Sequence, residues 1–98
     1  MDRHRIIETL RSHKGELQTA GIVHLSLFGS VARGEASSAS DIDLMADFDP
    51  SKRLTLVTLG SLQGRLSKML GTEVELSSSS WMREPVRSKA EREAVLAF

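Results

Sequence analysis

The 98-residue sequence contains no cysteine and has no net charge, since thirteen Lys and Arg residues balance thirteen Asp and Glu residues. The absence of cysteine excludes disulfides, thiolate nucleophiles and thiolate metal sites, and it fits a reducing compartment. A chain without an overall positive field is poorly suited to hold long nucleic acid, because that affinity comes mainly from neutralising phosphates. No apolar run approaches membrane-spanning length, and the first residues lead into no apolar signal-peptide core. We therefore expect a cytoplasmic protein that binds neither membranes nor long nucleic acid.

The remaining composition is that of an ordinary globular protein, with 40% hydrophobic and 27% charged residues. A chain of this length predicts one domain, spanning residues 1–98, with a thin core. The thin core leaves self-association, or a stable complex with a partner, as an open option.

Hydrophobic periodicity and turn residues predict alternating helices and strands. The expected helices are residues 3–13, a short turn capped by Ser30 and running through Arg33, residues 54–70, and residues 85–98. The expected strands are residues 22–28, 42–48 and 72–77, and residues 14–21 and 34–40 are expected as connections. This order predicts an α/β (α+β) fold with a small mixed sheet of three to four strands and helices packed on it.

Two acidic residues interrupt the apolar run of the second expected strand. Residues two apart on a strand point to the same face, so Asp41 and Asp43 project together while Ile42 and Leu44 turn into the core. Their α-carbons would lie roughly 6.5 Å apart. Two carboxylates at that spacing suit a pair of hard cations such as Mg²⁺, which lie roughly 3.5–4 Å apart in two-metal sites. The alternative, two surface acids that only aid solubility, is the commoner meaning of an isolated Asp-x-Asp.

A glycine-serine turn precedes this acidic pair. Gly29 lets a phosphate approach the backbone, and the Ser30 hydroxyl and the following amides offer hydrogen bonds to it. Arg33 lies one turn further on, and two interpretations of it stay open: a contact to phosphate, or a structural ion pair.

Glu75 is the candidate for a third carboxylate, because its side chain faces away from Val74 and Leu76. If its strand lies beside the second strand, it could join the acidic pair at one metal. The alternative is an ordinary exposed strand residue.

Other polar and aromatic residues are expected to have structural roles. The three histidines have no metal-ligand spacing. Asp47 and Asp49 continue the strand alternation and could face the site, but they are expected to be solvated. Trp81 is expected to be a packing anchor, and stacking on a base is the alternative. The charged stretch at residues 83–93 is expected to form a solvated helix face, with Val86 and Ala90 in core or partner contacts.

The stretch Leu27-Phe28-Gly29-Ser30-Val31-Ala32-Arg33-Gly34-Glu35-Ala36, followed by Ser40-Asp41-Ile42-Asp43-Leu44, resembles the signature of the DNA polymerase beta-like nucleotidyltransferases. The strongest resemblance is to the minimal nucleotidyltransferase group of bacteria and archaea, and it covers nearly the whole chain. Enzymes of this family transfer a nucleoside monophosphate from a triphosphate to an acceptor hydroxyl.

The resemblance implies ATP as substrate, two Mg²⁺ ions, and roles for six residues. The implied catalytic and metal-binding residues are Asp41, Asp43 and Glu75, and the implied nucleotide-binding residues are Gly29, Ser30 and Arg33. Glu75 departs from the family, because many relatives have aspartate at this position.

The minimal members often pair with a HEPN-domain protein. The resemblance therefore implies an antitoxin that transfers AMP to a HEPN-type toxin. One alternative is a catalytically weak or inactive subunit that neutralises its partner by binding it. Another, transfer to a small molecule such as an aminoglycoside, lacks a second domain to form the acceptor pocket.

Overall fold

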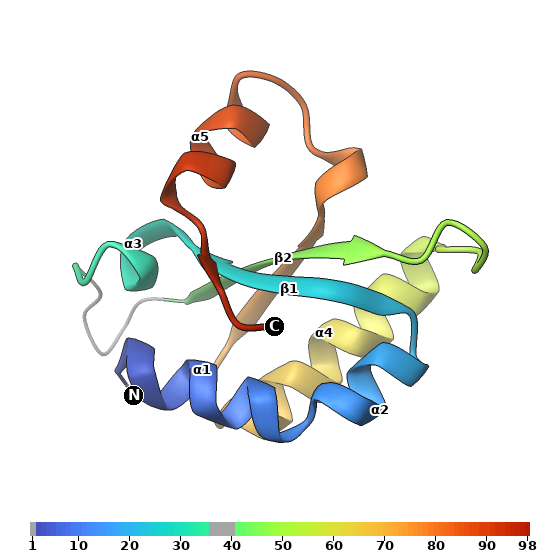
Figure 1. Ribbon diagram of the computed structural model, residues 1–98, viewed down its shortest axis with the longest axis horizontal. Coiled ribbons are helices and arrows are strands. Elements are labelled where there is room, and N and C mark those ends of the chain that lie inside the picture. The colour runs from blue at the N-terminus through green and yellow to red at the C-terminus, as the bar shows by residue number, and fades with distance from the viewer. Residues whose placement is uncertain (1, 36–40) are drawn as a thin grey trace.

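The computed structural model describes residues 2–35 and 41–98, and in it helices cover both faces of a single sheet (Figure 1). The helices are α1 (Arg3–Ser12), α2 (Lys14–Thr19), α3 (Gly29–Ala32), α4 (Leu56–Leu70), the 3₁₀ helix η1 (Ser79–Trp81) and α5 (Val86–Glu93). The strands are β1 (Ile22–Phe28), β2 (Ile42–Phe48), β3 (Val74–Ser78) and β4 (Val95–Leu96). No helix in the described ranges is both long enough and apolar enough to cross a membrane.

The four strands form one mixed sheet in the order β3-β2-β1-β4. Strand β1 is antiparallel to β2 and β4, whereas β2 and β3 are parallel and are connected through α4. A parallel pair requires such a crossover, because a tight turn can join only antiparallel neighbours. The predicted mixed sheet with packed helices is confirmed.

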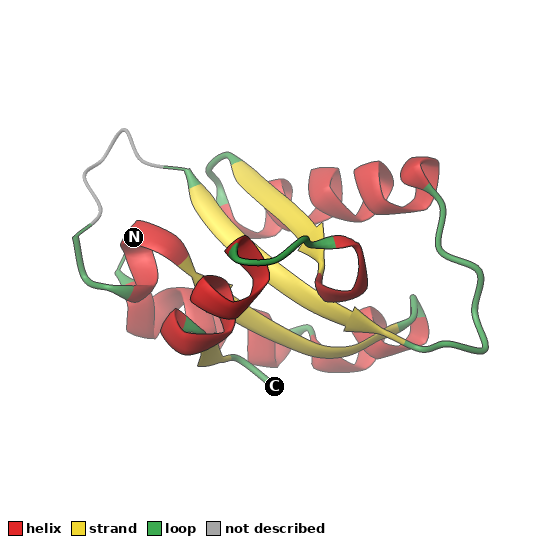
Figure 2. Cartoon of the chain, turned by 90° about the horizontal axis from the view of Figure 1, so that it is seen from above, coloured by secondary structure: helices red, strands yellow, loops and turns green. Residues whose placement is uncertain are grey.

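The two faces of β2 have different neighbours. Ile42, Leu44 and Ala46 are buried in the core, which they share with leucines of α1, α2 and α4. The residues between them, including Asp43, point to the opposite face by strand alternation. Figure 2 shows α5 and η1 lying over that face of the sheet. The sheet therefore places the acidic residue away from the main core.

The last predicted helix is wrong in its second half. Helix α5 ends at Glu93, the backbone becomes extended at Ala94, and the chain then adds β4 to the edge of β1. The Ala97 amide donates to the Leu25 carbonyl at 2.8 Å, and the Leu25 amide donates to the Phe98 carbonyl at 3.1 Å. The open edge of β1 offers these backbone partners, which a helix at this position would leave unpaired.

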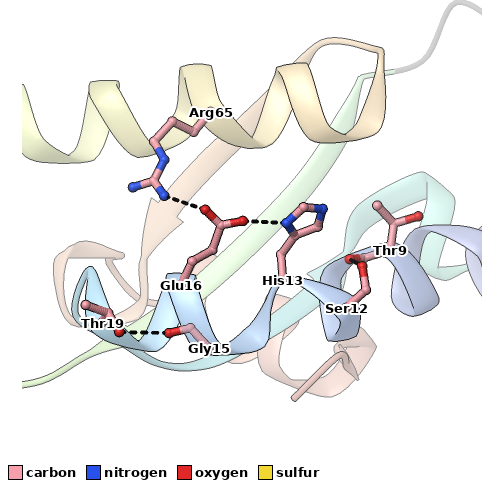
Figure 3. Close-up of polar contacts among 7 residues, drawn as sticks. All are labelled: Thr9, Ser12, His13, Gly15, Glu16, Thr19 and Arg65. Atoms are coloured by element: carbon pink, nitrogen blue, oxygen red, sulfur yellow. Dashed lines mark hydrogen bonds and ion pairs between the residues drawn. The ribbon is translucent and has the colours of Figure 1, made fainter.

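The connection expected after the first helix contains a second helix, α2. Its Leu17 is fully buried, although Gly15 weakens the helical pattern in the sequence. Glu16 ties α2 to α4: it accepts a hydrogen bond from His13 and pairs with Arg65 at 3.0 Å (Figure 3). The hydrogen bond from His13, more than the contact with Arg65, lowers the pKa of Glu16. Tertiary contacts thus stabilise a helix that the local pattern does not predict.

The remaining elements begin and end close to their predicted residues. Helix α4 begins two residues later than expected, because the Thr58 amide donates to the Thr55 hydroxyl oxygen and makes Thr55 the N-cap. Gly71, with a φ of 68°, ends the helix as predicted. Strand β3 occupies residues 74–78 rather than 72–77. Of the predicted loop at residues 34–40, residues 36–40 lie outside the described part of the chain.

Candidate active site

The site lies at the end of the sheet where β1 ends and β2 begins, next to α3 (Figure 1). Phe28, the last residue of β1, is directly opposite Asp43 of β2. Gly29 then takes a φ of 76°, a left-handed conformation that residues with a side chain rarely adopt. A Cβ at Gly29 would stand 2.4 Å from the Asp43 Oδ2 atom. Glycine is therefore needed here both for the turn and for the close approach of the carboxylate.

Asp43 is half-buried, and its pKa is raised. Burial is the largest cause, followed by the charges of Glu75 and Asp41, and the positive charge of Arg33 opposes them. Burial and neighbouring negative charges both disfavour an ionised carboxylate. A bound cation would offset the unfavourable charge of such a carboxylate.

Asp41 immediately precedes β2 and is exposed. Its charge acts on Asp43, as expected for two acids whose side chains leave one face of the chain. The structure therefore brings the predicted pair together at one end of β2.

Glu75 stands beside Asp43. The two residues are paired in the register of the parallel strands β2 and β3, so their side chains leave the same face of the sheet. Glu75 is exposed, and its charge is the largest electrostatic contribution to the raised pKa of Asp43. The sequence predicts that Glu75 can join the acidic pair if its strand lies beside β2, and β3 does lie beside β2.

Within the described ranges, no three histidine, aspartate or glutamate side chains form a preassembled metal-binding group. The donor chemistry nevertheless fits a hard cation, because carboxylate oxygens are the ligands that such cations prefer. Burial, and then the charges of Glu75 and Asp41, raise the pKa of Asp43, and a bound cation would offset that cost.

Ser30 is in the first turn of α3, but it is not the N-cap of that helix. The helix begins at Gly29, and Phe28, with an extended backbone, is its N-cap. The predicted cap is therefore two residues too late. No hydrogen bond of the Ser30 side chain is found among the described residues.

Arg33 forms two ion pairs. Its Nε atom is 2.7 Å from Glu35, and an Nη atom is 3.0 Å from Glu93 of α5. The hydrogen bond to Glu35 is the main cause that raises the pKa of Arg33. The structural ion pair, one of the two interpretations left open by the sequence, is therefore present, and a phosphate contact stays a prediction.

A cavity of about 270 Å³ adjoins Gly29 and Arg33. Its other lining residues are Phe28 at the end of β1 and, from α5, Val86, Lys89, Ala90 and Glu93. The sequence assigned no site role to α5, because a mixed-charge stretch usually forms a solvated surface. The signal that could have found it is helical spacing, since Val86, Ala90 and Glu93 are four and three residues apart and therefore share one face of the helix.

Two further acids, Asp47 of β2 and Asp49 just after it, stay outside the site. Asp47 accepts a hydrogen bond from Ser79 of η1, and Asp49 accepts hydrogen bonds from Ser51. Trp81 is 46% exposed, so the expectation that it is a packing anchor is wrong.

A model of the nucleotidyltransferase domain matches residues 6–97. The chain belongs to this nucleotidyltransferase family. The match covers the glycine-serine turn, the acidic pair and Glu75. The predicted membership of the nucleotidyltransferases, and with it the prediction of an enzyme, is confirmed.

Relatives of this nucleotidyltransferase align over most of its length. A Methanocaldococcus jannaschii protein, named as a candidate protein adenylyltransferase, is 35% identical over 92 residues, which are 93% of this chain and 92% of the relative. The protein adenylyltransferase MntA of Thermococcus cleftensis is 33% identical over 87 residues, or 88% of this chain and 86% of its own.

Solved structures confirm the nucleotidyltransferase fold. A protein described as a minimal nucleotidyltransferase matches with a TM-score of 0.72 and 34% identity, covering 97% of this chain and 95% of the other. The complex of a tri-AMPylated Shewanella oneidensis HEPN toxin with an MNT antitoxin has a TM-score of 0.67 at 16% identity, covering 94% of this chain and 71% of the other. The second likeness is one of fold.

Proposed function

We propose that this nucleotidyltransferase transfers AMP from ATP to a hydroxyl of a partner protein, and that it acts as the cytoplasmic antitoxin of a HEPN-type toxin. The observation that carries the proposal is the placement of Asp43 beside Glu75 and against Gly29. Two relatives with similar length carry names of protein adenylyltransferases, and a structural neighbour is an MNT antitoxin bound to an AMPylated toxin. Residues 1–98 would act as a single minimal nucleotidyltransferase domain.

The proposed roles follow from the position of each residue. Asp41, Asp43 and Glu75 would hold two Mg²⁺ ions, and Gly29 and Ser30 would receive the triphosphate at the start of α3. The ions supply neutralisation of phosphate charge and activation of the acceptor hydroxyl when bound. Arg33 and Lys89 also line the cavity beside Gly29, and their cationic groups suit the remaining phosphate charge.

In the proposed reaction the acceptor oxygen forms a bond to the α-phosphorus of ATP. The bond from that phosphorus to the bridging oxygen breaks, and pyrophosphate leaves with its electron pair. The acceptor hydroxyl loses its proton, for which the carboxylates of Asp43 and Glu75 are the neighbouring bases. In-line attack would invert the configuration at phosphorus.

Intact-mass spectrometry of the partner tests this proposal. A HEPN-type partner is sought as the product of the neighbouring gene and is incubated with ATP, Mg²⁺ and the folded nucleotidyltransferase. A mass gain of one or more AMP units is expected. Asp41→Asn combined with Asp43→Asn should abolish the gain. Asp47→Asn is the matched control on the same strand, because asparagine can still accept the hydrogen bond from Ser79. A partner that keeps its mass with the wild-type enzyme would contradict the proposal.

The alternative function is neutralisation by binding alone, and the glutamate at position 75 is the feature that favours it. The two functions differ in what the Asp41→Asn, Asp43→Asn variant does in cells that express the toxin. Adenylyl transfer predicts that this variant fails to protect the cells although it is folded and present. Full protection by the variant would establish the binding function instead.

A further inference from the structure

Glu75 is on an outer strand of the sheet, where half of the backbone has no neighbouring strand. Among the residues that the structure describes, strand β3 pairs only with β2, so its outward-facing amides need other partners. Val74 and Leu76, which flank Glu75, are both buried. An unpaired amide at a buried position would be costly and would leave this part of the strand poorly held.

Two side chains of α4 supply the missing partners. The Val74 amide donates to the Ser67 Oγ atom at 3.1 Å, and the Leu76 amide donates to the Gln63 Oε1 atom at 2.9 Å. Gln63 and Ser67 are four residues apart, so they lie on one face of the helix. The Ser67 hydroxyl in turn donates to the Gln63 backbone carbonyl at 3.0 Å, which orients its oxygen toward β3.

We infer that Gln63 and Ser67 are positioning residues for Glu75. They fix the backbone on both sides of the glutamate, so that its carboxylate stays level with Asp43 across the strand pair. This inference rests on the proposed function only in taking Glu75 as part of the cation site. The two hydrogen bonds explain how the Glu75 carboxylate can be held at a defined place on the edge of the sheet. They limit the backbone movement that would add to the freedom of the glutamate side chain, which is longer than that of aspartate.

The same arrangement has a second consequence for the sheet. The outward amides of β3 on both sides of Glu75 already have partners, so this edge is not available for pairing with a strand of another protein. An acceptor protein would reach the carboxylates from the end of the sheet where β2 begins, on the face to which Asp43 and Glu75 point.

The test follows Mn²⁺ binding to the purified protein by electron paramagnetic resonance, so that it needs neither acceptor nor turnover. Gln63→Met combined with Ser67→Ala removes both acceptors with little change in side-chain size. We expect this variant to bind Mn²⁺ roughly tenfold more weakly, the lower end of the usual effect of residues that orient metal ligands. Glu75→Gln should weaken binding by at least as much.

Non-additivity shows that the two residues act through Glu75. Adding Gln63→Met and Ser67→Ala to Glu75→Gln should cause no further loss of Mn²⁺ affinity. Ser67→Thr, which keeps the hydroxyl, should bind as the wild type does. Leu66→Val is the matched control for stability, because Leu66 is fully buried on α4 and no hydrogen bond from it to β3 is found among the described residues.

The inference would be overturned if the Gln63→Met, Ser67→Ala variant bound Mn²⁺ as tightly as the wild type. It would also be overturned if its loss of Mn²⁺ affinity added fully to that of Glu75→Gln, or if Leu66→Val lost as much Mn²⁺ affinity. A wild-type protein that binds no Mn²⁺ would overturn it as well. If the expected Mn²⁺ pattern appears but the partner gains no AMP, the proposed function fails and the positioning role stands. The two failures are therefore distinguishable.

Discussion

At the scale of single residues, the site combines one permissive backbone position with carboxylates that repel one another. Gly29 provides the turn and the space, and Asp43 occupies that space at an electrostatic cost. Functional sites commonly hold groups whose charges are unfavourable until a ligand arrives. Removing the Asp43 charge should therefore raise the stability of the free protein while it lowers the activity of the enzyme.

Gly29→Ala should abolish AMP transfer, and this loss should be larger than its lower stability can explain. A left-handed residue with a side chain costs roughly 1–2 kcal/mol, and the new Cβ would also displace the Asp43 carboxylate. Gly71→Ala is the matched control, since Gly71 has a φ of 68° and an added Cβ there meets nothing within 4 Å. Thermal unfolding and AMP transfer measure both effects. Equal activity in the two variants would show that the contact with Asp43 is unimportant.

Asp43→Asn should stabilise the metal-free protein at neutral pH. A carboxyl whose pKa is higher in the folded than in the unfolded chain binds more protons when folded, so the free energy of unfolding falls as pH rises through the interval between the two pKa values. The cost is then fully present at pH 7. We expect a gain of roughly 0.2–1 kcal/mol, the scale of a cross-strand pair partly screened by solvent.

The gain from Asp43→Asn should disappear below the ordinary aspartate pKa of about 3.9, where the carboxyl is protonated in both states. Urea unfolding with a chelator present, at neutral and acidic pH, measures it. Asp47→Asn should show no such gain, because the Asp47 carboxylate accepts a hydrogen bond from Ser79 that asparagine can also accept. A wild-type protein at least as stable as Asp43→Asn at pH 7 would refute the electrostatic explanation.

At the scale of elements, helices hold the site from two sides of the sheet. Helix α4 fastens the β3 edge through Gln63 and Ser67, and α5 is joined to α3 by the ion pair between Arg33 and Glu93. The hydrophobic pattern of the helices predicts neither set of contacts, because both use polar residues on helix faces that the pattern assigns to solvent.

Removing Arg33 and removing Glu93 should have different effects on catalysis. If Arg33 also contacts the triphosphate, Arg33→Ala raises the KM for ATP about tenfold or more, as expected for a lost hydrogen bond to a charged group. Glu93→Gln removes the ion pair but keeps the arginine, so we expect a much smaller change. Steady-state kinetics with varied ATP separates the two. Equal changes in both variants would mean that Arg33 acts only as a tie between α3 and α5.

At the scale of the whole molecule, the C-terminal residues complete the sheet and close the fold. Strand β4 is only two residues long, yet the residues after it bond with β1, and Arg11 of α1 donates to the Ala97 carbonyl at 2.6 Å. Ala97 itself is buried. The two ends of the described chain are thus fastened to each other across the edge of the sheet.

Deleting residues 95–98 should lower the free energy of unfolding by about 2–4 kcal/mol, since each of several lost hydrogen bonds contributes roughly 0.5–1.5 kcal/mol. Urea unfolding followed by circular dichroism measures the change. Leu96→Ser is the matched control, because Leu96 is 54% exposed and its backbone pairing is kept. We expect that variant to stay within about 0.5 kcal/mol of the wild type. A deletion variant as stable as Leu96→Ser would show that β4 contributes little.

Local chemistry in the sequence determined the family, the three main strands, the longest helix and the acidic pair with its glycine-serine turn. These features depend on periodicity, end signals and spacing, all of which are short-range properties of the chain. The short helix α2 and strand β4 were missed because their partners are distant in sequence: Glu16 pairs with Arg65, and Ala97 with Leu25.

Only the tertiary structure decided that Glu75 stands beside Asp43, that Arg33 is paired with α5, and that Gln63 and Ser67 hold the edge strand. The order of strands in the sheet sets these contacts, and no local pattern encodes that order. The sequence by itself therefore determined which groups the site contains. The packing of α4 and α5 against the sheet decided how those groups face one another, because long-range contacts are set by the topology of the whole molecule.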